Sequence, residues 1–254
     1  MSAALSIEGV SHAFGALDVL RDVSLAVGAN ELVALIGPSG CGKSTLLQIA
    51  GGLLLPDRGR VAMAPPPGGS LNPLTFVFQD FALLPWRSVA GNVAFALEHH
   101  ALPSAERDAI IADVLARTGL SDFRDALPKQ LSGGMRQRVG IARALAVRPS
   151  VMLMDEPFSA LDSQTRELLI EDLVTLLART KLAALYVTHN VDEALRLADR
   201  IVVLSRRPGA IRATIAIDTP RETRAMAMLS PIRDEIWSLM REGAIAADRD
   251  RIDG

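Results

Sequence analysis

The sequence predicts an α/β fold with a mainly parallel sheet, an antiparallel β-subdomain at the N-terminus and an inserted helical subdomain. One observation behind this is that brief runs rich in Val, Leu, Ile or Met alternate with longer segments of helical periodicity. Such alternation is typical of βαβ units around a parallel sheet. Another is that residues 80–130 hold several helical patterns and no strong strand pattern. The 254 residues suffice for one domain with a subdomain.

The individual elements follow from these patterns. The expected buried strands are Leu32–Ile36, Thr75–Phe78, Val151–Met154, Ala184–Thr188 and Ile201–Leu204. The expected helices are Lys43–Ala50, Gly91–His99, Ala105–Gly119, Asp122–Ala126, Gly133–Ala146, Ser163–Ala178 and Val191–Ala198. Leu5–Val10 and Val19–Val27 are expected to be antiparallel strands. Met63–Asn72 is rich in Pro and Gly and should be a surface loop, and Arg221–Ile245 should be an amphipathic helix.

Composition excludes several classes of protein. Hydrophobic residues make up 49% of the chain, which rules out a disordered protein. With 27 basic and 29 acidic residues, the net charge of −2 gives no general attraction to nucleic acid. The single cysteine, Cys41, permits no intramolecular disulfide and is compatible with a reducing cytoplasm. We expect neither a signal peptide nor a membrane span, because no basic leader and no run of about 18 apolar residues occurs.

A phosphate-binding loop is the strongest chemical signal. The pattern G-x-x-x-x-G-K-[ST] is matched by Gly37, Pro38, Ser39, Gly40, Cys41, Gly42, Lys43, Ser44 and Thr45. Glycines let the backbone amides curl around phosphate oxygens, and the following helix adds the positive end of its dipole. Lys43 would contact the β- and γ-phosphates, and the Ser44 hydroxyl would bind Mg²⁺. A glycine-rich turn that binds nothing is the alternative, which the preceding strand, the lysine and the hydroxyl together disfavour. ATP and Mg²⁺ are therefore the expected ligands of a P-loop NTPase core.

Two acids directly follow the apolar run Val151–Met154. Ligands of α/β folds sit at the carboxyl edge of the sheet, where Asp155 and Glu156 should lie. Asp155 would hold Mg²⁺ through water, and Glu156 would polarise the attacking water as a general base. The alternative is a strand that exits to solvent with two surface acids. The phosphate loop favours the functional interpretation.

A second glycine motif precedes the expected helix Gly133–Ala146. Ser132 is a good N-cap, and the amides of Gly133 and Gly134 favour an anion. On physical grounds alone, an ordinary serine cap beside two glycines is the favoured interpretation.

These residues carry a resemblance to a known family. LSGGMRQR at residues 131–138, followed about twenty residues later by VMLMDEP, resembles the signature and Walker B motifs of ABC ATPases. In the order typical of that family, Gln79 resembles the Q-loop glutamine, residues 159–162 (SALD) resemble the D-loop, and His189 resembles the switch histidine. Phe14 stands where the family usually has an aromatic that stacks on adenine. The resemblance covers residues 5–217.

Each of these residues also has a plain alternative role. Read alone, Gln79 would be a solvated loop residue and His189 a surface imidazole. The order and spacing of the motifs raise both above those alternatives. For Phe14, packing in the β-subdomain stays an equal alternative to stacking on adenine. Cys41 is interpreted as a small residue that fills space within the loop.

The resemblance implies a head-to-tail dimer with two ATP molecules between its subunits. Ser132, Gly133 and Gly134 would contact the γ-phosphate of the ATP held by Lys43 of the second copy. Asp162 would link the two sites. Hydrolysis would remove the bridging phosphate and open the dimer, a switch controlled by nucleotide.

The resemblance also implies roles in turnover and a division of the chain. Glu156 would be the catalytic base, His189 would contact the γ-phosphate, and Gln79 would contact both Mg²⁺ and the attacking water. Residues 1–79 and 150–217 would form the nucleotide-binding α/β core with its β-subdomain. Residues 80–149 would form the helical subdomain with the signature motif, and residues 218–254 a C-terminal helical tail.

The remaining motifs concern what ATP would power. Residues 81–89 (FALLPWRSV) are largely apolar yet lie in an expected loop, so they form either subdomain core or a groove for a partner helix. Together with residues 205–211 and 233–237, they resemble the importer subgroup for nitrate, sulfonate and taurine. That resemblance implies uptake of a small anionic solute through partner membrane-spanning permease subunits, with an external solute-binding protein acting indirectly. The chain would then lie peripherally on the cytoplasmic face of the inner membrane.

Two other classes of function are open to comparison. A soluble ABC ATPase that acts on nucleic acid or ribosomes would usually carry a coiled-coil insertion, tandem ATPase domains or a basic stripe, and this sequence has none of them. A binding module regulated by nucleotide without turnover is disfavoured by Glu156 and His189. The sequence departs from its relatives at Met135, which replaces the usual glutamine of the signature, and at Asn190, where many relatives have Asp. No nucleic-acid partner is expected.

Overall fold

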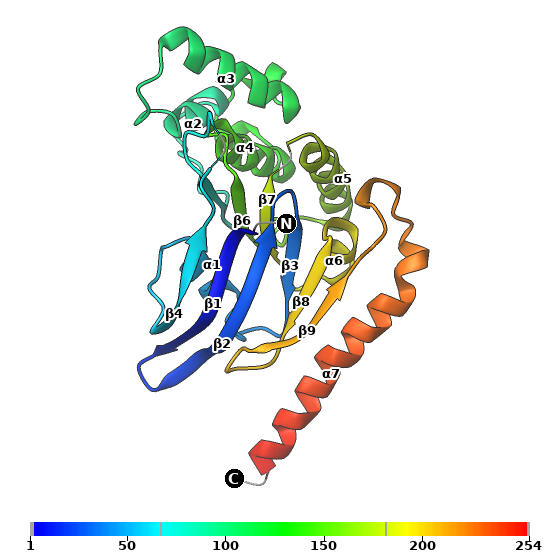
Figure 1. Cartoon of the computed structure of the whole chain (residues 1–254). Helices are drawn as coiled ribbons and strands as arrows, with labels where there is room; N and C mark the ends of the chain where they lie inside the picture. The colour runs from blue at the N-terminus through cyan, green and yellow to red at the C-terminus, as the bar shows by residue number, and fades with distance from the viewer. Residues whose placement is uncertain (1–2, 67, 181, 253–254) are drawn as a thin grey trace. The chain divides into compact units, whose positions relative to one another are not determined.

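The computed structural model describes residues 3–66, 68–180 and 182–252, and their side chains as far as residue 241. The chain divides into two compact units. The first comprises Met1–Pro65 and Ala183–Gly254, and the second comprises Pro66–Leu182 (Figure 1). Each unit is described by itself.

The first unit begins with an antiparallel sheet of order β2-β1-β4. Its strands are β1 (Ala3–Phe14), β2 (Leu17–Gly28) and β4 (Arg58–Met63). The strands β1 and β2 form a hairpin in which Phe14 pairs with Leu17 across a two-residue turn. One face of this hairpin is buried, because apolar side chains alternate along both strands, as the fully covered Val10 and Val23 illustrate. The antiparallel β-subdomain expected from the sequence is thereby confirmed.

Four further strands of the first unit lie in the order β7-β3-β8-β9. The parallel strands are β3 (Leu32–Ile36), β7 (Ala183–Val187) and β8 (Arg200–Leu204), and β9 (Ile211–Ala216) runs antiparallel to β8. Every residue of β3 and of β7 is buried, which explains why both read as continuous apolar runs. The mainly parallel sheet predicted from the sequence is confirmed.

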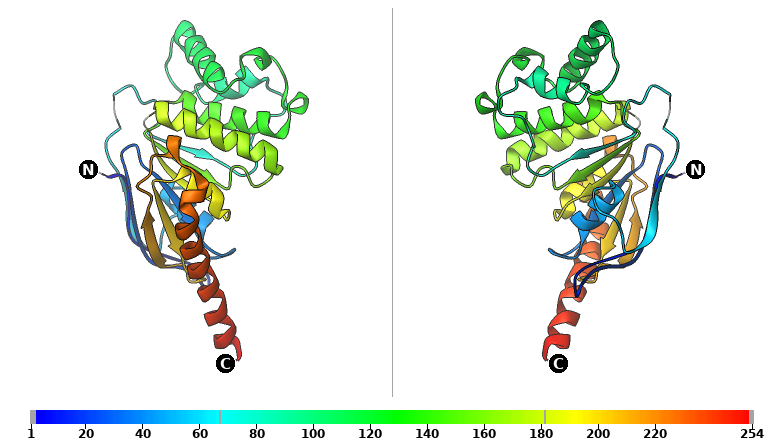
Figure 2. Two further views of the ribbon diagram at one scale, coloured as in Figure 1. Left: turned by 90° about the vertical axis from the view of Figure 1, so that its right-hand side faces the viewer. Right: turned by 90° about the vertical axis from the view of Figure 1, so that its left-hand side faces the viewer.

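Helices complete the first unit. They are α1 (Lys43–Ala50), α6 (Val191–Leu197) and α7 (Ser230–Ile252), with short 3₁₀ turns η3 (Arg221–Thr223) and η4 (Met226–Leu229) before α7. The expected single helix from Arg221 is therefore wrong in its start. Pro231 stands in the first turn of α7, where its missing N–H costs nothing. Figure 2 shows α7 running well past the strands of its own unit.

The second unit pairs two parallel strands with four helices. The strands are β5 (Leu74–Val77) and β6 (Val151–Asp155). The helices are α2 (Val89–Phe95), α3 (Ser104–Arg117), α4 (Gly133–Ala146) and α5 (Ser163–Thr180), with 3₁₀ turns η1 (Ser121–Phe123) and η2 (Pro128–Gln130). The helix expected over Asp122–Ala126 is wrong, because the chain there makes only the η1 turn. Helices α2 and α3 both pack on α4 (Figure 1).

Candidate functional site

The phosphate loop joins β3 to α1 in the first unit, as its motif requires. Gly42 caps α1 with a positive φ of 101°, a conformation that L-residues with side chains rarely adopt. A methyl group at Gly42 would lie 2.7 Å from Cδ2 of Leu20 on β2. Both constraints demand glycine at this position. The loop is therefore seated tightly on the β2 strand.

Lys43 is the first residue of α1, and its side chain folds back across the loop. Its ammonium donates hydrogen bonds to the carbonyl oxygens of Gly37 at 2.8 Å and Pro38 at 3.1 Å. The side chain is buried, with 6% relative exposure. A buried positive charge at the N-terminus of a helix forms an environment that favours an anion.

Cys41 is buried within the same loop, at 1% relative exposure. Burial raises the pKa of its thiol, although the charge of Lys43 acts in the opposite direction. The thiol is therefore protonated at neutral pH. The interpretation of Cys41 as a small space-filling residue agrees with this burial.

His189 lies close to the start of the phosphate loop. In the parallel pair β3 and β7, Leu35 stands opposite Val187, so the loop and His189 both follow the carboxyl ends of neighbouring strands. The amide of Thr188 extends the pairing by donating to the Leu35 carbonyl at 3.3 Å. The structure thus brings together two of the motifs that the sequence predicted as functional.

A buried carboxylate that the sequence did not single out supports the segment around His189. Glu193, on α6, is 4% exposed and accepts hydrogen bonds from the hydroxyls of Tyr186 at 2.7 Å and Thr188 at 2.8 Å. Asn190 caps α6 by accepting from the amides of Asp192 and Glu193. An Asn in place of the Asp of many relatives still performs this capping.

The acidic pair stands at the carboxyl edge of the second unit's strands. Asp155 ends β6, and Val77 at the end of β5 pairs with Met154, so Gln79 follows the neighbouring strand at the same edge. Glu156 has a positive φ of 43°, which is unusual for a residue with a side chain. Its carbonyl accepts hydrogen bonds from the amide and the hydroxyl of Ser159, at 3.2 Å and 3.0 Å. A strained backbone of this kind tends to occur at functional positions.

The signature motif and the D-loop lie against each other in the second unit. Ser132 caps α4 by accepting from the Met135 amide at 3.2 Å. A methyl group at Gly134 would lie 2.7 Å from Cγ2 of Thr165, so α4 begins in close contact with the start of α5. Asp162 accepts from the Thr165 amide at 3.0 Å, and this hydrogen bond lowers the pKa of Asp162. The aspartate expected to link two sites is therefore also the first-turn partner of α5.

Phe14 is not part of the β-subdomain core. Its side chain is 53% exposed at the end of β1. The ring meets the edge of His12, with centroids 4.7 Å apart and planes at 88°. His12 itself is buried, and its Nδ1 lies 3.4 Å from a carboxylate oxygen of Asp57. Of the two alternatives for Phe14, packing in the subdomain is thus excluded.

The apolar loop before α2 is held rigidly but leaves its tryptophan open. Asn92, with no exposed surface, accepts from the Leu84 amide and donates to the carbonyls of Leu84, Arg87 and Ser88. Trp86 is nevertheless 72% exposed. The expectation that this stretch could simply be subdomain core is therefore wrong for Trp86.

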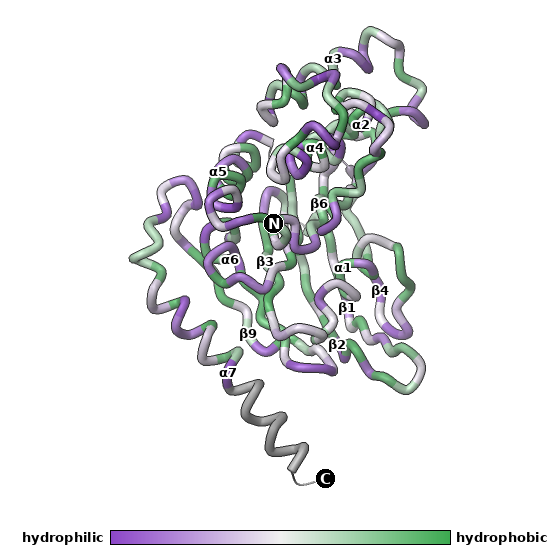
Figure 3. Tube along the Cα trace, turned by 180° about the vertical axis from the view of Figure 1, so that it is seen from behind, coloured by the Kyte–Doolittle hydropathy of each residue, from purple (hydrophilic) through white to green (hydrophobic). Residues whose placement is uncertain are grey.

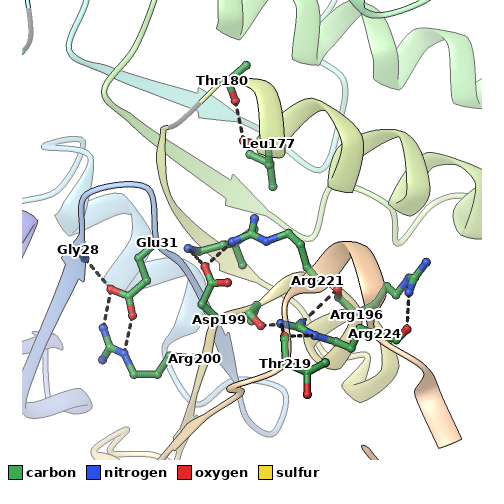
Figure 4. A network of polar contacts seen from close by, with 12 residues as sticks. Gly28, Glu31, Leu177, Thr180, Arg196, Asp199, Arg200, Thr219, Arg221 and Arg224 are labelled. Carbon is green, nitrogen blue, oxygen red and sulfur yellow. Dashed lines mark hydrogen bonds and ion pairs between the residues drawn. The ribbon is translucent and has the colours of Figure 1, made fainter. Parts of the chain in front are cut away.

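The C-terminal segment is anchored by a buried arginine. Arg224 is 3% exposed, and it donates to the carbonyls of Leu195 and Ala198 at the end of α6 and to that of Thr219 (Figure 4). Burial lowers the pKa of Arg224. Asp199 accepts from the neighbouring Arg221 and from the Leu32 amide. These contacts fix the chain that leads into α7, whose described part carries both polar and apolar side chains (Figure 3).

The donors expected for Mg²⁺ are all oxygen atoms: the Ser44 hydroxyl, the Asp155 carboxylate and the Gln79 amide. Among residues 3–66, 68–180 and 182–241, no cluster of three or more His, Cys, Asp or Glu side chains could hold a metal. Mg²⁺ does not require such a cluster, because it is usually bound by one or two carboxylates together with substrate phosphates. The donor set therefore fits a nucleotide-bound Mg²⁺. None of the helices in the described chain is long and apolar enough to cross a membrane.

Comparison with known proteins agrees with this site. A family model described as ABC transporter matches residues 20–159. The chain therefore belongs to the ABC transporter family, and the class that fold and family define is its ATP-binding subunit, an ATPase. A solved dimeric structure of MJ0796, described as a bacterial ABC transporter cassette, aligns with a TM-score of 0.71 at 32% identity. The alignment covers 85% of this chain and 99% of that one.

Three relatives are named as import proteins. The aliphatic sulfonates import ATP-binding protein SsuB 1 of Xanthomonas axonopodis pv. citri is 44% identical, over 94% of this chain and 96% of its own length. The taurine import ATP-binding protein TauB of Pseudomonas putida is 42% identical, over 85% and 84%. The nitrate import ATP-binding protein NrtC of Synechococcus elongatus is 39% identical, over 95% of this chain and 39% of its own length. The predicted resemblance to the nitrate, sulfonate and taurine subgroup is confirmed.

Proposed function

We propose that this chain is the ATP-hydrolysing subunit of an importer for a small anionic solute such as a sulfonate, taurine or nitrate. The observation that carries the ATPase part is the buried Lys43 ammonium, held over its own loop at the start of α1. The names of the relatives support the importer part. A family ATPase with all its motifs in order is built for turnover rather than for binding alone.

In this proposal the phosphate loop binds and orients ATP. Residues 37–45 present their backbone amides to the phosphates, and Lys43 exchanges its carbonyl partners for β- and γ-phosphate oxygens. Phe14 offers an exposed ring to adenine. Ser44 and Asp155 would hold Mg²⁺, which when bound neutralises charge on the β- and γ-phosphates. Positioning of this kind accounts for most catalysis in phosphoryl transfer.

Three side chains act on the attacking water and the γ-phosphate. Glu156 polarises the water as the general base. Its strained backbone at the end of β6 is the structural support for that role. Gln79 orients the water from the same sheet edge, and His189 donates to the γ-phosphate.

We further propose that two copies assemble head to tail with ATP between them. Ser132, Gly133, Gly134 and Asp162 of one copy would complete the site built on Lys43 of the other. The dimeric cassette among the structural neighbours supports this arrangement. It can be tested with mixed dimers that carry Lys43→Ala and Ser132→Ala. If activity is the same whether the two lesions fall in one shared site or in separate sites, the shared-site model is wrong.

The membrane partner would dock on the loop around Trp86. That side chain is exposed while Asn92 holds its loop in shape, as a preformed docking surface requires. Permease subunits bound there would hold the chain at the cytoplasmic face of the inner membrane, with an external solute-binding protein acting only through the permease.

One experiment separates this proposal from its alternatives. The tagged chain would be isolated from native membranes, and uptake of radiolabelled taurine, an alkanesulfonate and nitrate would be measured in a strain that lacks its gene. We expect a multi-span membrane protein to co-purify and one uptake activity to be lost and restored by the intact gene. Co-purification of ribosomes or nucleic acid, with all three uptake activities unchanged, would refute the importer.

A further inference from the structure

The loop between β8 and β9 lies directly against the phosphate loop. Gly209, in this loop, is buried, and a methyl group built on it would lie 2.1 Å from the carbonyl oxygen of Cys41. That is far inside van der Waals contact, and the opposing atom belongs to the backbone rather than to a flexible side chain. The backbone of Gly209 is not among those with positive φ, so the close contact, and not its conformation, requires glycine.

Gly209 is fixed in place by the second β-strand. Its amide donates to the Val19 carbonyl at 2.8 Å, and its carbonyl accepts from the Arg21 amide at 3.0 Å. These two hydrogen bonds make a parallel bridge with Leu20. The side chain of Leu20 in turn packs against the Gly42 position. The phosphate loop thus rests on a seat made of Val19, Leu20 and Gly209.

A serine closes the β8–β9 loop around Gly209. The Ser205 amide donates to the Ala210 carbonyl at 2.9 Å, and the Ala210 amide donates back to the Ser205 hydroxyl at 3.0 Å. That hydroxyl lies 3.2 Å from the Pro208 carbonyl, to which it can donate. The position of Gly209 is therefore determined from both sides.

The contact sets the orientation of one particular peptide group. The carbonyl of Cys41 and the amide of Gly42 belong to the same planar unit, which is not among the cis bonds of the structure. In a trans peptide the C=O and N–H point in opposite directions. A Cys41 carbonyl that faces Gly209 therefore turns the Gly42 N–H away from the β8–β9 loop.

We propose that Gly209 is a positioning residue of the phosphate loop, which presents the Gly42 amide to nucleotide phosphate by seating the Cys41 carbonyl. This inference rests on the proposed assignment of residues 37–45 to the phosphates. It adds a residue from the far end of the chain to the binding machinery. Any side chain at Gly209 must displace or turn the Cys41–Gly42 peptide.

The single cysteine allows that peptide to be observed alone. Labelling cysteine with ¹³C at the carbonyl and glycine with ¹⁵N gives one amide-to-carbonyl cross-peak, because Cys41–Gly42 is the only Cys-Gly pair in the sequence. The variants are Gly209→Ala, which adds the obstructing methyl, and Ser205→Ala, which loosens the loop without adding atoms. The control is Arg206→Ala in the same loop, where the exposed side chain is removed and the backbone carbonyl that faces Ser205 is kept.

The expected results distinguish the two proposals. Without nucleotide, the cross-peak of Gly209→Ala should move away from its wild-type position while that of Arg206→Ala stays. The Kd for MgADP should rise about tenfold or more in Gly209→Ala and less in Ser205→Ala. An unmoved cross-peak and unchanged Kd in Gly209→Ala would overturn the inference. If that variant does not fold, the same null result in Ser205→Ala overturns it. A wild-type cross-peak that ignores MgADP would instead refute the phosphate assignment, and the nucleotide-free spectra would still test Gly209.

Discussion

The hydroxyl of Tyr186 on β7 donates a 2.7 Å hydrogen bond to the buried carboxylate of Glu193 on α6. The same carboxylate accepts from Thr188, the residue before His189. One acid thus ties the strand that delivers the expected switch histidine to the helix that follows it. Its function is to hold the segment in place.

Replacement of Glu193 by Ala should therefore affect both stability and turnover. Two buried hydroxyls would lose their acceptor, so the free energy of unfolding should fall by about 2–4 kcal/mol. His189 would be positioned less well, so kcat for ATP should fall more than the affinity for ATP. Urea unfolding and steady-state kinetics measure the two effects, and Asp192→Ala at the exposed neighbouring position is the control. Equal stability of Glu193→Ala and wild type would contradict this reading of the hydrogen bonds.

A second prediction concerns Lys43. Removal of its ammonium in Lys43→Ala takes away the one buried cation that bonds to the Gly37 and Pro38 carbonyls. Charge-assisted hydrogen bonds to phosphate should be lost, so ATP should bind at least about tenfold more weakly. Isothermal titration with MgATP measures this change. The exposed Lys129→Ala is a matched control that should bind as wild type does, and unchanged binding by Lys43→Ala would remove the loop from the site.

Glu156→Gln separates binding from chemistry. The amide keeps the size of the side chain but cannot act as a base, so turnover should fall by a factor on the order of 100 or more while ATP still binds. Because hydrolysis is expected to open the dimer, this variant should accumulate as an ATP-bound dimer in size-exclusion chromatography with MgATP. Glu167→Gln, an exposed acid on α5, should behave as wild type does. Normal turnover by Glu156→Gln would show that another group is the base.

The sequence predicted the buried strands well, because β3, β6, β7 and β8 consist of continuous apolar runs that only a covered sheet explains. It missed β4 and β9. The strand β4 begins Arg-Gly-Arg and is largely exposed, and β9 alternates between half-buried and exposed residues. Neither strand buries enough apolar surface to stand out from a loop.

Supporting residues were harder to find than motif residues. Glu193 lies in the first turn of a helix, where acids are common on the surface, and only the fold brings Tyr186 onto it. Asn92 likewise gives no signal until the loop around Leu84 wraps over its amide. Motifs can be predicted because their chemistry fixes the residue types locally. Supports depend on contacts between segments that the sequence does not place side by side.

The last prediction follows from the buried thiol of Cys41. The thiolate is the reactive species, and burial raises the pKa of this thiol. At neutral pH the folded protein therefore holds less thiolate than a free cysteine, and alkylation by iodoacetamide should be slow. The rate should increase about tenfold per pH unit and keep rising above pH ~8.5, where the rate for an ordinary thiol levels off.

Two controls make this rate informative about the site. The same chain unfolded in urea should show the ordinary profile, because the thiol is then exposed to solvent. MgADP should slow alkylation of the folded chain, since Cys41 lies within the loop proposed to bind the phosphates. A rate that levels off at or below the ordinary thiol pKa would contradict the burial of Cys41, and a rate indifferent to MgADP would mean that nucleotide does not cover this loop.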